Sequence, residues 1–110
     1  MDEWSEWRRF PDPRNGDYLC APFGPGVYEL RNSRTGEAIC PGESKNVAFR
    51  MSSLIPAPYG RSGRNNALKR EYVLKNLADL EYRTIACRSK AEAKHVENRL
   101  KSSKQFMFPN

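Results

Sequence analysis

Residues that could bind a phosphate lie in the segment GEAICPGESKNVAFR, residues 36–50. We expect a short strand to end at Pro41 and a helix to begin at Ser44. Asn46 and Arg50, four residues apart, then share one face of that helix. Arginine carries a planar, permanently charged group that can bind phosphate oxygens in pairs. Three interpretations stay open at this point: an active site, an active site that has lost a residue, or an ordinary transition from strand to helix.

Basic residues are concentrated in the middle and C-terminal parts of the chain. Residues 31–75 contain nine Lys and Arg against three Asp and Glu, and residues 76–110 contain seven against four. Residues 1–30 are acidic, with three basic and six acidic side chains. The formal net charge is +6, and a focused positive field attracts polyanions such as nucleic acid. Charge alone leaves nucleic-acid binding and simple solubility equally open.

The length of 110 residues indicates one domain with one core. The 38% hydrophobic and 29% charged content is typical of a globular protein. No apolar run approaches the roughly 20 residues that a membrane span requires, and the first ten residues lack the apolar region of a secretory signal. We therefore expect a cytoplasmic protein without membrane association.

The three cysteines, Cys20, Cys40 and Cys87, are widely spaced and form no CxxC motif. This pattern argues against a disulfide framework and against a zinc site made of cysteines alone. We expect three free and mostly buried thiols.

Three segments have the composition of β-strands. Residues 27–31 alternate apolar and polar side chains, and residues 37–40 follow the turn-forming sequence NSRTGE, so the two are predicted to form a hairpin. Residues 80–88 are rich in strand formers and predict a third strand. Because Pro41 cannot donate a hydrogen bond to a neighbouring strand, it should lie at the strand's end, at a bulge or at a sheet edge.

Three helices are predicted after the hairpin. The first runs from a cap at Ser44 to about residue 54, and its buried positions are Val47, Met51 and Leu54. The second runs from a cap at Asn65 or Asn66 to about residue 78. Its buried stripe is Leu68, Tyr72, Val73 and Leu77, and the positions off this stripe are Lys69, Arg70 and Lys75.

The third helix opens with the sequence Ser89-Lys90-Ala91-Glu92, which fits the S-x-x-E capping box. Ala93, Val96 and Leu100 are its predicted buried positions, and Glu97 borders them. A further short helix is predicted within residues 1–10, where Trp4 and Trp7 would cover part of the core.

The fold class predicted from this order is α+β, with a small three-stranded antiparallel sheet flanked by helices. Residues 1–110 form a single domain, and residues 1–25 are an N-terminal extension to it.

Assembled in this order, the motifs resemble the GIY-YIG endonuclease superfamily over about residues 26–110. Gly26-Val27-Tyr28 is similar to the first motif, and Cys40-Pro41-Gly42 aligns with the second motif while keeping its glycine. The sequence GESKNVAFR then matches the family's pattern through Asn46 to Arg50. Glu97 matches the family's metal-binding glutamate, and Asn110 resembles the asparagine that closes its core.

The resemblance implies a phosphodiester hydrolase that uses Mg²⁺ or Mn²⁺. Glu97 would be the carboxylate that binds the metal, which completes its shell with water and phosphate oxygens. Arg50 would bind the phosphate, and Tyr28 would activate the water or relay its proton. The substrate implied is DNA, including branched or nicked DNA, cut with little sequence specificity. Target recognition would come from a protein partner, or the chain would act on any exposed branch or end.

The same resemblance gives a set of nucleic-acid contacts on the basic middle part of the chain. Such contacts position the phosphate backbone without reading its sequence. The residues assigned to this role are Lys45, Asn46, Arg61, Arg64, Lys69 and Arg70. The alternative for the basic side chains is an ordinary solvated face.

Three residues depart from the family pattern. Cys40 stands in place of the second motif's tyrosine and Pro41 in place of its isoleucine, while Glu43 stands where some relatives have lysine. A thiol is a poor ligand for a hard cation. These departures favour a second hypothesis, a catalytically silent nucleic-acid-binding module on the same scaffold. A third is a protein-interaction domain that uses the acidic, tryptophan-containing N-terminus.

Overall fold

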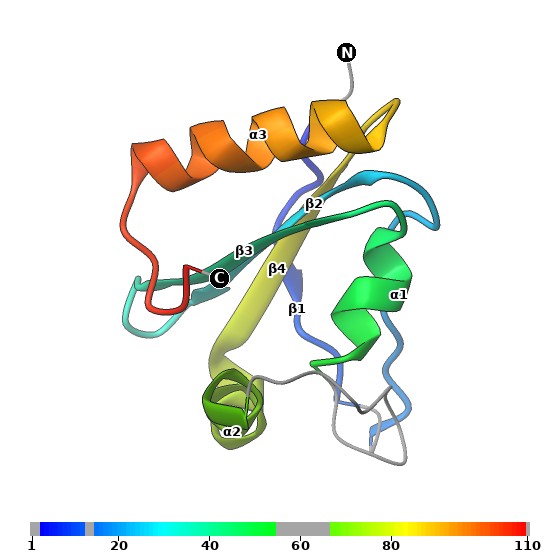
Figure 1. The fold of residues 1–110 in the computed structure, drawn as a ribbon. Coiled ribbons are helices and arrows are strands. Elements are labelled where there is room, and N and C mark those ends of the chain that lie inside the picture. Colours follow the sequence, from blue (N-terminus) through cyan, green and yellow to red (C-terminus); the bar gives the residue numbers. More distant parts are fainter. Residues whose placement is uncertain (1–2, 13–14, 55–66, 110) are drawn as a thin grey trace.

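The computed structural model describes residues 3–12, 15–54 and 67–109. They form an α+β domain whose antiparallel sheet has four strands in the order β1-β4-β2-β3 (Figure 1). The strands are β1 (Arg8–Arg9), β2 (Gly26–Asn32), β3 (Ala38–Ser44) and β4 (Leu80–Ala86). The helices are α1 (Val47–Ser52), α2 (Ala67–Lys75), the 3-10 turn η2 (Leu77–Asp79) and α3 (Lys90–Ser103). The predicted fold class is confirmed, with four strands instead of three.

The strands β2 and β3 form the predicted hairpin around Asn32. The side-chain oxygen of Asn32 accepts hydrogen bonds from the backbone N–H groups of Arg34 and Thr35, at 2.9 and 3.1 Å. Gly36 has a φ of +80°, a conformation that glycine adopts without steric cost. The turn sequence therefore reverses the chain as expected, because Asn32 and Gly36 supply the side-chain bonds and the left-handed residue that it needs.

The strand β3 continues past the point where the sequence predicts its end. The predicted strand covered residues 37–40, whereas β3 extends to Ser44 and includes Pro41. Proline is tolerated there because β3 is an edge strand of the described sheet, with β2 as its neighbouring strand. The predicted end at Pro41 was wrong, and the alternative that the proline marks a sheet edge is confirmed.

The helix α1 begins later than predicted, with Asn46 and not Ser44 as its N-cap. The side-chain oxygen of Asn46 accepts a hydrogen bond from the backbone N–H of Phe49 at 3.0 Å. Ser44 lies two residues before this cap, and its hydroxyl oxygen accepts a hydrogen bond from the backbone N–H of Asn46 at 3.0 Å. The three positions predicted to face the core, Val47, Met51 and Leu54, are buried.

The N-terminal segment adds a strand to the sheet and does not form the predicted short helix. The backbone N–H of Ser5 donates to the carbonyl oxygen of Thr84 at 2.7 Å, and that of Phe10 donates to Leu80 at 2.9 Å. An isolated helix of ten residues is marginal in water, whereas the edge of β4 offers partners for these backbone groups. The extension is thus part of the sheet, and the buried ring of Phe10 lies in the core.

Side chains alternate along β2, so each face of the sheet has its own hydrophobic cluster. Tyr28 and Leu30 belong to the cluster that also contains the buried residues of α1 and α2. Val27 belongs to the other cluster, with Ala93 and Leu100 of α3. Figure 1 shows this separation, with α3 on one side of the sheet and α1 and α2 toward the other.

The helix α2 has different ends and a different buried face from those predicted. It ends at Lys75, after which η2 leads into β4. Lys69, predicted to lie off the buried stripe, is 1% exposed, while Leu68, predicted to lie on it, is exposed. Val73 and Leu77 are buried as predicted, and the predicted caps Asn65 and Asn66 lie outside the described residues.

The helix α3 begins as its sequence predicts. The hydroxyl oxygen of Ser89 accepts a hydrogen bond from the backbone N–H of Glu92 at 3.1 Å, which is the capping arrangement. Ala93 and Leu100 are buried, and Val96 packs against the same cluster. Among the described helices, none is long and apolar enough to cross a membrane.

Candidate functional site

Tyr28 lies in β2, between its partner residues Gly42 of β3 and Thr84 of β4. The side chain is 1% exposed. Its hydroxyl end lies over Gly42, because a methyl group added at Gly42 would collide with the ring and with the hydroxyl oxygen. The glycine that the second motif keeps therefore has a steric role, since it makes room for the phenol. The hydroxyl end of Tyr28 consequently reaches the edge strand of the sheet.

The first-motif glycine, Gly26, also has a steric role. A methyl group there would collide with the carbonyl oxygen of Ile85 on β4 and would crowd Val47 of α1. The absence of a side chain at Gly26 allows β4 and α1 to approach β2 closely. The glycine of the first motif thus allows close packing around β2, and Gly42 leaves room for the ring of Tyr28.

Cys40 occupies the position that the resemblance gives to a second tyrosine. It is buried, lies opposite Leu30 in the sheet and belongs to the same cluster as Tyr28. Cys87 is also buried, whereas Cys20 is exposed, and no disulfide joins the three cysteines. The expectation that they form no disulfide framework is confirmed, and two of them have the expected burial.

Arg50 and Lys45 are exposed, on α1 and just before it. Asn46 is half-buried and is engaged as the N-cap of α1. The helix has no acidic residue in its first turn, and Arg50 is the basic residue of its last turn. Arg50 and Lys45 therefore have the exposure that a phosphate contact requires, whereas Asn46 has a structural role that its sequence position alone did not reveal.

Glu97 lies on α3 with a side chain that is 13% exposed, and its Oε1 lies 3.5 Å from Nζ of Lys101. The helix α3 packs against β2 and β3 on the face opposite to Tyr28. Tyr28 and Glu97 therefore approach the sheet from opposite faces. The edge strand β3 lies next to both elements. The hydroxyl end of Tyr28 lies over β3, and α3 packs against β3.

Glu43, another departure from the family pattern, lies on the α3 side of β3. Its partner residue in β2 is Val27, and its Oε1 lies 3.6 Å from Nζ of Lys90 in the first turn of α3. Its Oε2 is buried and has no hydrogen-bond partner among the described residues. The carboxylate thus faces α3, and Lys90 offsets part of its charge.

A buried charge cluster joins the N-terminal segment, the sheet and the end of α3. Glu29 is 1% exposed, and its two carboxylate oxygens lie 2.8 Å from Arg83 and 2.8 Å from Lys104. The guanidinium of Arg83 lies 4.4 Å from the ring centroid of Trp4 and 4.8 Å from that of Trp7. Sequence reasoning missed Glu29, although the alternation of VYELR places it on the face of Val27.

This cluster also bears on the proposed use of the N-terminus as an interaction segment. Trp7 lies 4.0 Å from the guanidinium of Arg31, which in turn pairs with Glu81 at 2.8 Å. Both tryptophans are half-buried. They contact cations of the sheet, and Trp4 also packs against the cluster under α3, as predicted for a core-covering role.

The remaining residues assigned to nucleic acid divide into two groups. Arg61 and Arg64 lie outside the described residues. Lys69 is buried and Arg70 is half-buried, so neither presents a fully solvated charge for a phosphate. His95 is exposed on α3.

Two groups with a shifted pKa lie outside the predicted site. Burial raises the pKa of Tyr82, whose hydroxyl oxygen accepts a hydrogen bond from the backbone N–H of Cys20 at 2.9 Å. The backbone and side-chain hydrogen bonds from Arg88 lower the pKa of Glu92. Both shifts have structural causes, because the groups hold the N-terminal segment and the start of α3.

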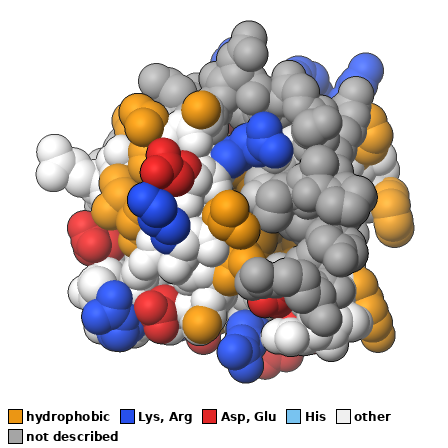
Figure 2. Space-filling view, turned by 90° about the horizontal axis from the view of Figure 1, so that it is seen from below, with side chains coloured by type: hydrophobic (Ala, Val, Ile, Leu, Met, Phe, Trp, Pro, Cys, Tyr) orange, Lys and Arg blue, Asp and Glu red, His pale blue; other side chains and the backbone are white. Residues whose placement is uncertain are grey.

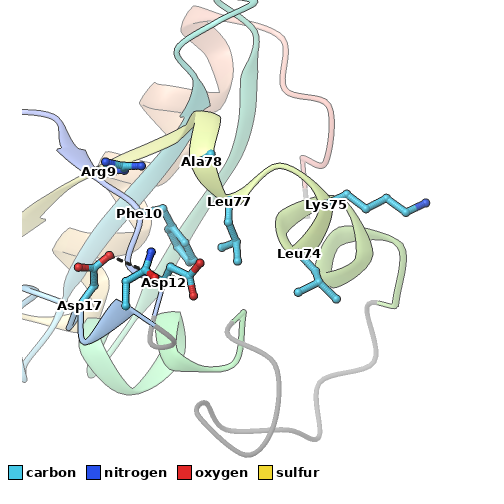
Figure 3. Close-up of a pocket in the computed structure, with 9 residues that line it drawn as sticks. Arg9, Phe10, Asp12, Asp17, Leu74, Lys75, Leu77 and Ala78 are labelled. Carbon is cyan, nitrogen blue, oxygen red and sulfur yellow. Dashed lines mark hydrogen bonds between the residues drawn. The ribbon is translucent and has the colours of Figure 1, made fainter.

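A cavity of about 240 Å³ opens between the N-terminal segment and α2 (Figure 3). Figure 3 shows Phe10, Asp12 and Asp17 on one side, with Lys75 extending away from them. The lining residues are Arg9, Phe10, Asp12, Asn15, Asp17, Leu74, Lys75, Leu77 and Ala78. The predicted catalytic residues are absent from this lining, so the cavity is separate from the candidate site.

The surface seen from below Figure 1 mixes charges of both signs with hydrophobic side chains (Figure 2). Basic and acidic groups lie side by side on its described part. Among the described cations that were assigned a phosphate contact, Arg50 and Lys45 are the exposed ones.

Comparison with known proteins gives one partial similarity. No protein-family model matches the sequence. A stretch of 79 residues is 35% identical to the UvrABC system protein C of Chlorobium luteolum. The match covers 72% of this chain and 11% of that protein, so the chain corresponds to a small part of the relative's length.

Proposed function

We propose that this chain is a nuclease domain of the GIY-YIG type that hydrolyses phosphodiester bonds in DNA. The observation that carries the proposal is the 35% identity to UvrABC system protein C across most of the chain. The motif glycines support it, because Gly42 leaves room for the phenol of Tyr28 and Gly26 lets β4 and α1 approach β2 closely. The proposed substrate is DNA that is branched or nicked, cut with little sequence specificity, and a protein partner supplies the target.

Three residues have assigned roles in the proposal. Arg50 binds the phosphate through its exposed guanidinium group. Glu97 holds a divalent cation, and Tyr28 orients the attacking water or accepts its proton through the hydroxyl that lies over Gly42. Tyr28 and α1, which carries Arg50, lie on one side of the sheet and α3, which carries Glu97, lies on the other, so the role proposed for Glu97 rests on its match to the family motif.

The donor atoms suit a hard cation such as Mg²⁺ or Mn²⁺, bound weakly. The described residues contain no cluster of three or more His, Cys, Asp or Glu side chains that could enclose a metal ion. Mg²⁺ does not require such a cluster, because it keeps several waters and takes one or two carboxylates plus substrate phosphates. Glu97 would provide that carboxylate after release from Lys101. A bound cation would supply charge stabilisation to the phosphate and the leaving oxygen.

The test is cleavage of supercoiled plasmid by the purified chain with Mg²⁺, with Mn²⁺ and with EDTA. Glu97→Gln should abolish metal-dependent nicking, since the amide removes the anionic ligand. Glu71→Gln is a matched control, because Glu71 forms the same kind of pair with Lys75, four residues on and at 2.9 Å. Equal nicking by the parent and Glu97→Gln would exclude the assigned role of Glu97.

The second candidate function is a catalytically silent nucleic-acid-binding module. Cys40 favours it, because the thiol that stands in the second motif in place of a tyrosine is a poor ligand for a hard cation. This module would bind DNA with an affinity that falls steeply with salt. It would leave the DNA intact with every divalent ion, so metal-dependent nicking would eliminate it.

A further inference from the structure

Two exposed phenylalanine rings lie on α1, which carries Arg50, and on the segment bound to its first turn. Phe23 is 84% exposed and Phe49, in α1, is 52% exposed. We propose that Phe23 and Phe49 form a stacking platform for unpaired DNA bases beside the bound phosphate backbone. The inference rests on the proposed function and narrows its substrate to DNA with single-stranded nucleotides next to the site of phosphate binding.

Two backbone hydrogen bonds hold the segment of Phe23 against α1. The N–H of Val47 donates to the carbonyl oxygen of Gly24 at 3.1 Å, and the N–H of Ala48 donates to Pro22 at 2.8 Å. The residues on either side of Phe23 are therefore fixed to the first turn of the helix that presents Phe49. In Figure 1 the chain leading into β2 runs beside α1, in agreement with these bonds.

The charge around the two rings suits a polyanion. Lys45 and Arg50 are exposed, and residues 45–53 contain no acidic side chain. Residues 18–24, which lead to the other ring, contain no charged residue. The surface thus combines aromatic rings with two cations and no carboxylate on its own segments. That composition is the one by which proteins hold single-stranded nucleic acid without reading its sequence.

Aromatic stacking selects unpaired bases over paired ones. In a duplex the faces of the bases are covered by their neighbours, so an external ring finds a base face only at an end, a gap, a flap or a junction. Phosphates are present in both kinds of DNA, so Arg50 and Lys45 contribute to the binding of either. Phe23 and Phe49 therefore determine preference between DNA structures, and the cations determine affinity for all of them.

The experiment measures binding by fluorescence anisotropy in EDTA, which prevents cleavage. Three DNAs carry the same number of phosphates: a blunt duplex, a duplex with an oligothymidine overhang, and a duplex whose overhang is abasic. The parent should bind the thymidine overhang more tightly than the other two. Phe23→Ala and Phe49→Ala should each weaken binding to that overhang about fivefold or more, and change binding to the blunt duplex less than twofold.

The abasic overhang makes the test specific for stacking. Removing the base and removing the ring delete the same contact, so Phe49→Ala should have no further effect on the abasic DNA. Leu74→Ala is the control for loss of an exposed apolar side chain, because Leu74 is exposed on α2 and lines the cavity of Figure 3. It should leave all three affinities unchanged.

The proposal is overturned if both phenylalanine variants bind the thymidine overhang as the parent does, or if they weaken binding to all three DNAs equally. This result is distinct from failure of the proposed function. If the chain never cuts DNA but Phe49→Ala still removes its preference for the overhang, the stacking platform is supported and the nuclease activity is excluded. If the chain cuts DNA and neither ring affects its binding preference, the nuclease activity is supported and the stacking platform is excluded.

Discussion

The phenol of Tyr28 lies over Gly42, its partner residue on the neighbouring strand. Tyr28 belongs to the first motif and Gly42 to the second, so the two motifs fit together at one point of the sheet. The contact explains why a glycine remains where Cys40 and Pro41 depart from the family pattern. It also directs the hydroxyl of a buried tyrosine toward the edge strand.

Gly42→Ala should destabilise the domain by about 1–3 kcal/mol or more, because the added methyl group collides with a buried ring. Urea unfolding followed by tryptophan fluorescence measures the change. Gly24→Ala is the control, since a methyl group there meets no atom within 4 Å. The cost of Gly42→Ala should shrink in a Tyr28→Leu background, which removes the ring, and an unchanged cost would contradict the steric explanation.

Glu29→Gln should lower the free energy of unfolding by about 2 kcal/mol, because it removes a buried charge that accepts bonds from Arg83 and Lys104. The same urea titrations provide the measurement. Glu81→Gln on the same strand pair is the control, since Glu81 and its partner Arg31 are partly exposed and should contribute less than about 1 kcal/mol. If the two variants were equally stable, the charge cluster would not be what holds the N-terminal segment and α3 to the sheet.

The difference in stability between the parent and a Glu92→Gln variant, which alters the capping box of α3, should depend on pH. Hydrogen bonds from Arg88 lower the pKa of Glu92 below its ordinary value of 4.5. The bonds to the carboxylate therefore stabilise the folded state above pH 4.5, and this stabilisation is lost as the pH falls through the lower folded-state value. The difference in Tm between the parent and Glu92→Gln should be largest at neutral pH and should close in acid.

The serine of the same box supplies the control for this pH dependence. Ser89→Ala removes an uncharged acceptor and should cost about 1 kcal/mol at every pH, because its hydroxyl does not titrate. A Tm difference for Glu92→Gln that stayed constant down to strong acid would show that Arg88 does not hold the carboxylate.

Elements with strong local signals could be predicted from the sequence. The hairpin turn, the capping box of Ser89 and the buried stripe of α1 all depend on residues within one turn of each other. The strand β1 could not be predicted in this way, because its formation depends on the free edge of β4, far away in the sequence. Lys69 shows the same limit, since it is buried although helical periodicity placed it off the buried stripe.

The candidate site could be predicted in part. The positions of Arg50 on an exposed face and of Glu97 at the border of a buried stripe follow from helical periodicity. The burial of Tyr28 and the separation of Tyr28 and Glu97 onto opposite faces depend on the complete sheet. Asn46 was assigned to DNA and serves as a helix cap, because the sequence offered Ser44 as an equally good cap.

The most direct measurement of the central claim is the single-turnover rate of DNA nicking at saturating Mg²⁺, with binding measured separately on the same DNA in Ca²⁺. The account predicts that Glu97→Gln lowers the rate by at least about a hundredfold, since it removes the carboxylate assigned to the metal. DNA affinity and the free energy of unfolding should stay close to those of the parent. A parent that nicks DNA at a rate unchanged by Glu97→Gln, or that binds DNA and never nicks it, would contradict the account.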